Sequence, residues 1–238
     1  MRILGLIPAR GGSKGLPHKN RLEAGGIPLL AWTIRVALQC PRLTRLVLST
    51  DDPELAAIAR AEGCEVPFER PAELASDTAG SAAVVLHALE QLGADWDALV
   101  LLQPTSPLRQ PSDLEAALDL YAAQAPPASV VSVVEVQAPL PAQYLLQADG
   151  TLRRAHPDAA PVSRRQDAPP VLTPNGAIYI VEPAAFVRRP SFVDATTRAL
   201  VMPRERSLDI DEAQDLAYLR FLCSQNPQLV PPPQRLEP

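Results

Sequence analysis

Short, continuous apolar runs recur along the chain and are separated by longer amphipathic stretches. The runs cover residues 3–7, 46–48, 99–102 and 130–136 and are rich in β-branched side chains. Such runs predict strands that are buried on both faces of a parallel sheet. The stretches between them, at about residues 29–38, 54–62, 82–92 and 114–123, have the apolar spacing of helices. This alternation predicts an α/β fold with a doubly wound, mostly parallel sheet.

Local capping signals mark where two of these helices begin. Asp52 followed by Pro53 suits an N-cap and a first helical position. Ser112 together with Glu115 has the spacing of a capping box, which predicts the start of the next helix. We interpret these residues as structural.

The pattern changes after residue 136. Residues 137–174 are rich in proline, weakly periodic and contain several arginines, and Asn175-Gly176 then opens a last apolar segment at 177–181. A final helix is predicted at about 212–222, followed by a proline-rich loop at 227–238. We therefore expect a single domain that spans residues 1–238 and carries an inserted segment.

The overall composition is that of a globular protein with no targeting segment. The chain has 238 residues, 47% hydrophobic and 21% charged, and its 27 prolines are roughly twice the usual share. We see no secretion signal or membrane anchor, and the three cysteines are too far apart for a thiolate metal site. These features predict a reducing, cytoplasmic location. The net charge of −5 argues against nucleic acid as a partner.

A glycine-rich basic loop follows the first predicted strand and carries the strongest chemical signal. Residues 7–20 read I-P-A-R-G-G-S-K-G-L-P-H-K-N. Glycines let backbone N–H groups approach an anion, while Arg10, Lys14 and Lys19 supply charge and Ser13 a hydroxyl. The loop matches neither the Walker pattern nor G-x-G-x-x-G. Because ligands of open α/β sheets bind where strands end, the loop predicts a phosphate site.

Lysine usage supports this interpretation over a solvated basic turn. Lys14 and Lys19 are the only lysines in the chain, and the other basic residues are all arginine. Lysine and arginine differ in shape and hydration, so their exchange is not neutral at a close-fitting site. The pattern indicates that compact ammonium groups are needed in this loop.

Two carboxylates near the carboxyl end of the chain form a candidate metal site. Asp209 and Asp211 follow the strand-like residues 200–202 and point the same way if the segment is extended, which would give two hard oxygen ligands for Mg²⁺. In the alternative interpretation, Asp211 is only the N-cap of the last helix, with Gln214 at the third helical position.

The loop and five further motifs resemble the acylneuraminate cytidylyltransferases, or CMP-sialic acid synthetases, and the related legionaminic and pseudaminic acid enzymes. The resemblance covers nearly the whole chain. Besides the loop it includes S-T-D-D at 49–52, E-R-P-A-E-L-A at 69–75, L-L-Q-P-T-S-P-L-R at 101–109, N-G-A-I-Y at 175–179 and D-I-D at 209–211.

The resemblance implies a Rossmann-like nucleotidyltransferase core and a homodimer formed through the inserted segment at about 137–174. It also implies transfer of CMP from CTP to a nine-carbon acidic sugar, with Mg²⁺ (or Mn²⁺) as cofactor and release of pyrophosphate. The metal ligands would be Asp209 and Asp211. The remaining implied roles are triphosphate binding by Arg10, Ser13, Lys14 and Lys19, with Arg10, Lys14 and Lys19 catalytic; base or ribose binding by Asn20, Arg70 and Ser81; and sugar binding by Gln103, Arg165, Gln166 and Tyr179.

Several alternatives stay open at this point. A related enzyme that acts on 3-deoxy-octulosonate has a similar fold but lacks the G-G-S-K-G run. A non-catalytic nucleotide-binding protein on the same fold is the alternative from another class. The motifs do not separate sialic, legionaminic and pseudaminic acids. No general base is assigned, because His18 suits a surface turn and His87 falls on a predicted helix.

Overall fold

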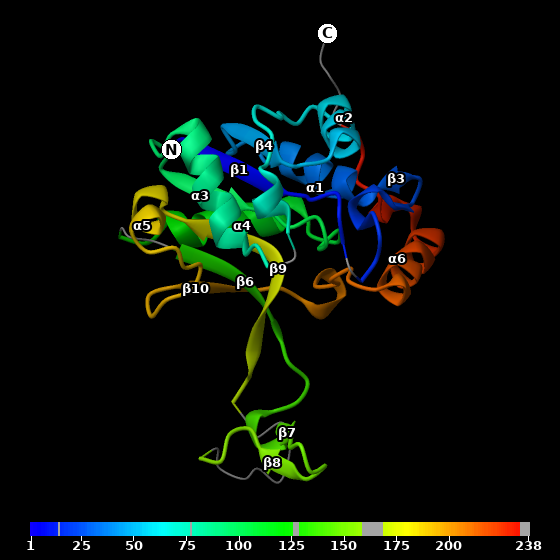
Figure 1. The fold of residues 1–238 in the computed structure, drawn as a ribbon, viewed down its shortest axis with the longest axis vertical. Helices are drawn as coiled ribbons and strands as arrows, with labels where there is room; N and C mark the ends of the chain where they lie inside the picture. Colours follow the sequence, from blue (N-terminus) through cyan, green and yellow to red (C-terminus); the bar gives the residue numbers. More distant parts are fainter. Residues whose placement is uncertain (14, 77, 126–128, 159–168, 234–238) are drawn as a thin grey trace.

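A six-stranded sheet forms the centre of the molecule. The computed structural model describes residues 1–238 except 14, 77, 126–128, 159–168 and 234–238. The strand order is β10-β6-β9-β5-β1-β4, and Figure 1 labels all of these strands except β5. These strands span Ile3–Pro8 (β1), Arg45–Ser49 (β4), Ala98–Leu101 (β5), Ser129–Glu135 (β6), Leu172–Val181 (β9) and Arg198–Val201 (β10). Only β9 is antiparallel to its neighbours, so the predicted mostly parallel sheet is confirmed.

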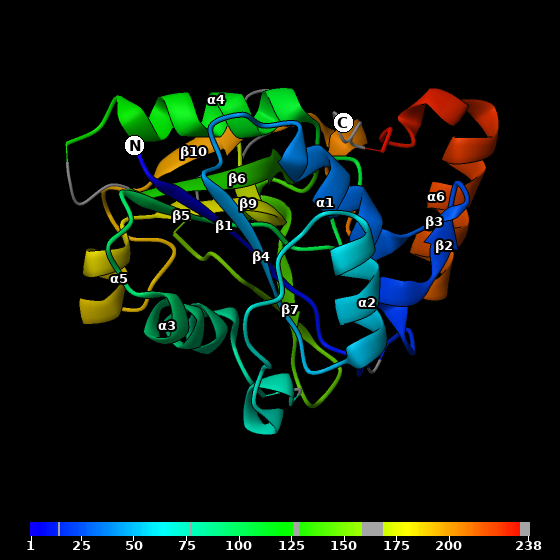
Figure 2. The same cartoon turned by 90° about the horizontal axis from the view of Figure 1, so that it is seen from above.

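Helices cover both faces of this sheet, as Figure 2 shows. Those on one face are α1 (Leu29–Leu38), α2 (Pro53–Ala61) and α4 (Pro111–Ala122). Those on the other are α3 (Ser81–Leu92) and α5 (Pro183–Arg188). Successive residues of β1 alternate between the two cores: Ile3 and Ile7 pack toward α1, and Leu4 and Leu6 toward α3. Because both faces are covered, the strand is apolar throughout.

The predicted helix starts are confirmed in one case and wrong in the other. The Asp52 carboxylate accepts hydrogen bonds from the backbone N–H groups of Glu54 and Leu55, as an N-cap does. The next helix begins at Pro111 rather than after Ser112. Its capping box joins Gln110 and Asp113, because Pro111 suits the first helical position and sets the start earlier than expected.

The segment after β6 leaves the body as an extended arm (Figure 1). Its tip is a two-stranded antiparallel ribbon of β7 (Tyr144–Leu146) and β8 (Leu152–Arg154). The arm returns through β9, which begins at Leu172, so the last part of the stretch predicted as irregular belongs to a sheet strand. Glu135 pairs with Leu172, which shows that β6 and β9 form the arm's stem.

The carboxyl-terminal helix α6 (Ala213–Gln225) packs beside a small hairpin of β2 (Glu23–Ala24) and β3 (Ile27–Pro28). Trp32 lies at the centre of this cluster and donates a hydrogen bond from its indole nitrogen to the carbonyl oxygen of Ala24 at 3.1 Å. A 3₁₀ turn (Pro227–Leu229) follows α6, so the predicted loop at 227–238 does not begin as irregular chain.

The three cysteines of the chain are all buried. Cys40, Cys64 and Cys223 are buried free thiols, and burial is the main reason that the pKa of each is raised. Across the part of the chain that the structure describes, no helix has the length and apolarity needed to cross a membrane.

Candidate active site

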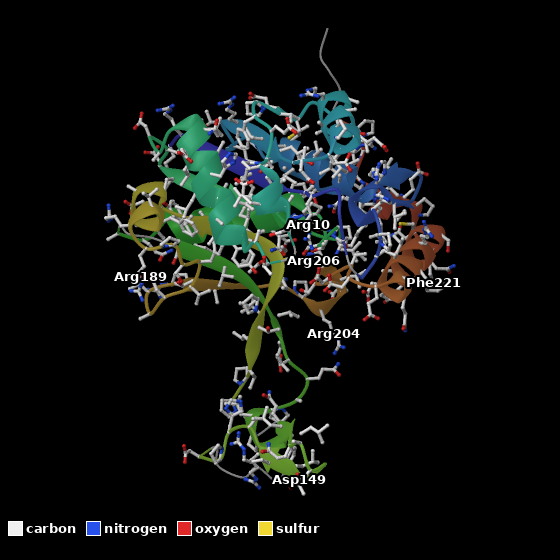
Figure 3. The ribbon with its side chains drawn as sticks, in the orientation of Figure 1. Arg10, Asp149, Arg189, Arg204, Arg206 and Phe221 are labelled. Carbon is white, nitrogen blue, oxygen red and sulfur yellow. The ribbon has the colours of Figure 1, made fainter. Side chains whose placement is uncertain are left out.

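A cavity of about 260 Å³ opens at the edge of the sheet where β1 and β5 end. Its lining comes from the loop after β1, the stretch that leads into α3, the loop after β5 and the segment before α6. Figure 3 labels Arg10, one of the lining residues, within the body of the molecule. The predicted site residues that line the cavity are Arg10, Ser13, Lys19, Asn20, Arg70, Ser81, Gln103, Asp209 and Asp211.

The other predicted residues are not among the described lining. Lys14, Arg165 and Gln166 lie outside the residues that the structure describes. Tyr179 lies on β9, where its ring packs against Phe192 with centroids 5.1 Å apart. Burial, followed by the negative charge of Asp209, raises the pKa of the Tyr179 hydroxyl.

The backbone of the glycine-rich loop lies against two other segments, the one after β4 and the D-I-D segment before α6. The N–H of Gly11 donates to the Asp51 carboxylate at 3.0 Å, which ties the loop to the end of β4. A Cβ atom at Gly15 would lie 2.7 Å from the carbonyl oxygen of Asp211. Since real Cβ atoms do not approach backbone so closely, only glycine lets the loop lie against the D-I-D segment.

Lys19 and Asp211 join the loop to the carboxylate segment. The Lys19 ammonium lies 2.9 Å from an Asp211 carboxylate oxygen, although the residues are 192 positions apart in sequence. The Lys19 side chain is only 11% exposed, whereas that of Asp211 is 70% exposed. The ammonium is thus held inside the cavity, and Asp211 keeps surface available for a second cation.

Asp209 also lines the cavity. Burial is the main cause of its raised pKa; a hydrogen bond from Thr105 and the charge of Lys19 act in the opposite direction, while the charge of Asp211 raises the pKa further. The backbone N–H of Ile210 also donates to the Thr105 carbonyl at 2.8 Å. Thr105 is a site residue that the sequence interpretation missed, although it lies in the quoted Q-P-T-S-P motif.

Asp211 is not the N-cap of the last helix. That position belongs to Glu212, whose N–H donates to the Asp215 carboxylate at 2.7 Å. The alternative interpretation of Asp211 as the cap, with Gln214 at the third helical position, is therefore wrong. A competing capping pair one residue later in the chain explains the difference.

Arg70 and Asn20 also contribute polar groups to the lining of the cavity. The Arg70 guanidinium is buried and donates to both the side chain and the carbonyl oxygen of Ser49. Burial lowers the pKa of Arg70 to about 10, so it stays charged at neutral pH. Asn20 donates to the Arg10 carbonyl at 3.2 Å, while its Oδ1 is buried without a hydrogen-bond partner among the described residues.

Neither histidine considered as a base lines this cavity. His18 is an exposed turn residue with φ of 55°, next to Arg21. His87 lies on α3 and packs edge-on against Phe68, with ring centroids 5.2 Å apart.

Comparison with known proteins gives a consistent family. The cytidylyltransferase family model matches residues 4–225. An N-acylneuraminate cytidylyltransferase from Escherichia coli is 36% identical over 90% of this chain, which spans 50% of that relative's length. A CMP-N,N'-diacetyllegionaminic acid synthase from Legionella pneumophila is 34% identical over 95% of this chain and 98% of its own.

A solved structure supports the fold independently. The structure of a CMP:2-keto-3-deoxy-manno-octonic acid synthetase complexed with CTP matches with a TM-score of 0.71 at 18% identity, over 94% of this chain and 99% of its own. The likeness at this identity concerns the fold alone. Sequence and fold together place this chain in the cytidylyltransferase family.

Proposed function

We propose that this chain transfers CMP from CTP to a nine-carbon 2-keto acid sugar and releases pyrophosphate. The observation that carries the proposal is the convergence of the glycine-rich loop and the D-I-D segment on one cavity, joined by Lys19 and Asp211. The relatives reported above support a sugar of the sialic or legionaminic acid class. Since CTP is a cytoplasmic metabolite, we place the reaction in the cytoplasm.

In the proposed reaction, the anomeric hydroxyl of the sugar attacks the α-phosphorus of CTP. The new bond joins the sugar oxygen to that phosphorus, the bond to the bridging oxygen of the β-phosphate breaks, and the hydroxyl proton passes to solvent or an unassigned base. Arg10, Ser13 and Lys19 line the cavity and bind the triphosphate, and their preorganised charge stabilises the departing pyrophosphate. Lys14 has the same proposed role.

The nucleoside end of CTP is proposed to lie against Asn20, Arg70 and Ser81. The buried Oδ1 of Asn20 has no partner in the described part of the chain, so a donor group of the base or ribose would satisfy it. Arg70 presents a desolvated guanidinium to the same cavity, which suits a carbonyl or phosphate oxygen.

The acidic sugar is assigned to Gln103, Tyr179, Arg165 and Gln166. Gln103 lines the cavity, and its amide oxygen lies beside Gly176 of β9. A guanidinium pairs well with a carboxylate, so Arg165 is proposed to bind the sugar's acid group.

Gly176→Ala is expected to raise the KM for the sugar about tenfold. This factor corresponds to an energetic cost of about 1–2 kcal/mol, the scale of placing a side chain on left-handed backbone and displacing its neighbour. Gly176 has φ of +77°, and an added Cβ would lie 2.6 Å from the Gln103 amide oxygen. The Gln103 side chain must then move, while CTP binding stays unchanged. Gly93→Ala is the control, because Gly93 has φ of +80° but nothing within 4 Å of the added atom. Equal kinetics in both variants would remove Gln103 from the sugar site.

Mg²⁺ is the proposed cofactor, with Asp209 and Asp211 as its protein ligands and Mn²⁺ as a substitute. The two side chains line one cavity, and the charge of Asp211 raises the pKa of Asp209. Among the described residues, no group of three or more His, Cys, Asp or Glu side chains could hold a metal ion. Mg²⁺ fits this set, because it takes one or two carboxylates and completes its shell with phosphates and water. When bound, it would neutralise charge on the phosphates.

A homodimer is proposed to form through the arm. The ribbon at its tip exposes apolar side chains: Tyr144 at 50%, Leu145 at 45%, Leu146 at 74% and Leu152 at 66%. Such a cluster on a projecting ribbon is costly in water and suits burial against a second copy. The inserted segment also carries Arg165, so the active site would be shared between subunits.

Mixed dimers test this arrangement. Arg165→Ala and Lys19→Ala subunits are each expected to be nearly inactive alone, whereas a refolded mixture regains activity. One of the two sites in each hybrid dimer then combines Lys19 of one subunit with Arg165 of the other. Pyrophosphate release measured after mixing, beside native mass spectrometry of the dimers, checks the result. Hybrid dimers without recovered activity would contradict a shared site.

The decisive experiment for the function is pyrophosphate release with CTP and Mg²⁺ across sialic, legionaminic and pseudaminic acids. Release with any of them is expected, and release with none would refute the proposal. Turnover of 3-deoxy-octulosonate alone would favour the related eight-carbon enzyme. CTP binding without release in any mixture would favour a non-catalytic nucleotide-binding protein.

A further inference from the structure

Arg109 carries a positive charge that is buried inside the protein behind the active-site loop after β5. Its side chain is among the largest that are fully buried, and its residue is 2% exposed. The residue ends the L-L-Q-P-T-S-P-L-R motif and precedes α4. None of the roles proposed above uses it.

The guanidinium is held by neutral acceptors from three parts of the chain. Nη1 donates to the carbonyl oxygen of Ala177 on β9 at 2.5 Å. Nη2 is within hydrogen-bond distance of the Thr33 hydroxyl on α1 at 2.9 Å, and of the carbonyl oxygens of Gln103 at 2.9 Å and Ser106 at 3.2 Å. Arg109 thus connects the loop to the sheet and to the helix layer.

No carboxylate among the described residues is hydrogen-bonded to this charge. The nearby acid, Asp113, is engaged by Arg206 at 2.8 Å and by the N–H of Gln110 at 2.9 Å. Burial lowers the pKa of Arg109 to about 9, which still leaves it charged at neutral pH. A buried charge is stable only if dipoles are oriented toward it, so the carbonyl groups of the loop must keep pointing inward.

This inward orientation determines what the loop presents to the cavity. With the carbonyls of Gln103 and Ser106 directed at Arg109, the Gln103 side chain and Thr105 lie on the cavity side. Thr105 in turn contacts Asp209 and accepts a hydrogen bond from the Ile210 N–H. The contacts therefore run from Arg109 through this loop to Gln103, which is proposed to bind the sugar, and to Asp209, which is proposed to bind the metal ion. The glycine-rich loop is not part of this chain of contacts.

We propose that Arg109 is a positioning residue that sets Gln103 and Asp209 through the loop at 103–106, and so controls use of the sugar and of the metal ion rather than CTP binding. The inference rests on the function proposed above for its kinetic consequence. Its structural part, the loop held by a buried guanidinium, stands independently. Lysine cannot replace Arg109, because a single ammonium does not reach two elements as a planar fork does.

The kinetic test compares Arg109→Lys with the wild type. We expect at least a tenfold rise in the KM for the sugar and a tenfold fall in kcat, with the Kd for CTP measured without metal changed less than twofold. Leu118→Ala is the control for general destabilisation, because Leu118 is a fully buried α4 residue outside the loop. A parallel change of all constants in both variants, or a normal sugar KM in Arg109→Lys, would overturn the proposal.

Two further measurements keep the test informative if Arg109→Lys folds poorly or the wild type releases no pyrophosphate. Thr33→Val removes only one acceptor and should shift the sugar KM in the same direction by a smaller factor. Hydrogen exchange reports the loop without any activity: in Arg109→Lys or Thr33→Val the Ile210 amide should exchange at least tenfold faster, while the Gly11 amide is unaffected. Unchanged exchange at Ile210 would refute the positioning role, whereas absent release by the wild type would refute the proposed function.

Discussion

Asp209→Asn is expected to lower turnover at least about a hundredfold while the protein stays folded, the scale of losing a main electrostatic contribution to a transition state. Asp209 is one of the two cavity carboxylates, and its pKa is raised, mainly by desolvation. A neutral amide in its place removes the charged oxygen that is proposed to bind Mg²⁺, but it keeps the shape of the side chain and its contact with Thr105. Steady-state pyrophosphate release across a range of Mg²⁺ concentrations measures the effect.

Asp211→Asn is expected to behave in the same way, and it separates ligation from helix capping. The cap of α6 lies at Glu212, so the substitution leaves the helix start intact. Asp119→Asn is the matched control, because Asp119 is a 77% exposed acid on α4 that pairs with Arg42. Near-normal turnover of Asp209→Asn and Asp211→Asn at every Mg²⁺ concentration would exclude both residues as metal ligands.

Lys19→Met is expected to reduce kcat/KM for CTP by roughly a hundred- to a thousandfold, as for removal of one preorganised charge at a phosphate. Lys19 is held within the cavity by Asp211, so its charge is already placed before substrate binds. Methionine keeps much of the side-chain length and loses the ammonium. Kinetics with varied CTP at saturating sugar provide the measurement.

Lys19→Arg tests whether shape matters as well as charge. The bulkier planar guanidinium should still impair CTP use in a close-fitting loop, by a smaller factor than methionine does. Lys14→Arg is expected to act in the same direction. Arg45→Lys serves as the control. It exchanges arginine for lysine at the start of β4, in an ion pair with Glu65 that does not involve the loop. Wild-type kinetics in both lysine variants would mean that the two lysines are placed there by coincidence.

The element pattern was predictable because its signals are local. Continuous burial makes β1 and β5 apolar throughout and β4 apolar at its centre, and the helix at 29–38 is observed as α1 with the same ends. Asp52 caps α2 through bonds to residues two and three positions later, so sequence neighbours suffice to predict it. The predicted start of α4 was wrong because two capping pairs compete within a few residues, and Pro111 at the first helical position favours the earlier pair.

Strand direction could not be derived in the same way. An apolar run is equally apolar in either direction, and β9 is antiparallel because the chain first leaves through the arm and returns from its far end. That reversal brings Gly176 to the edge where β5 ends, against Gln103. The contact between them is therefore invisible in the sequence.

The sequence by itself determined which functional groups the candidate site has: two lysines confined to a glycine-rich loop, and two carboxylates in the D-I-D segment. Residue type and local spacing decide such features. Only the tertiary structure decided that Lys19 meets Asp211 across 192 positions, that Thr105 contacts Asp209, and that Arg109 is buried. Long-range contacts and burial depend on how the whole sheet assembles, and no local pattern specifies them.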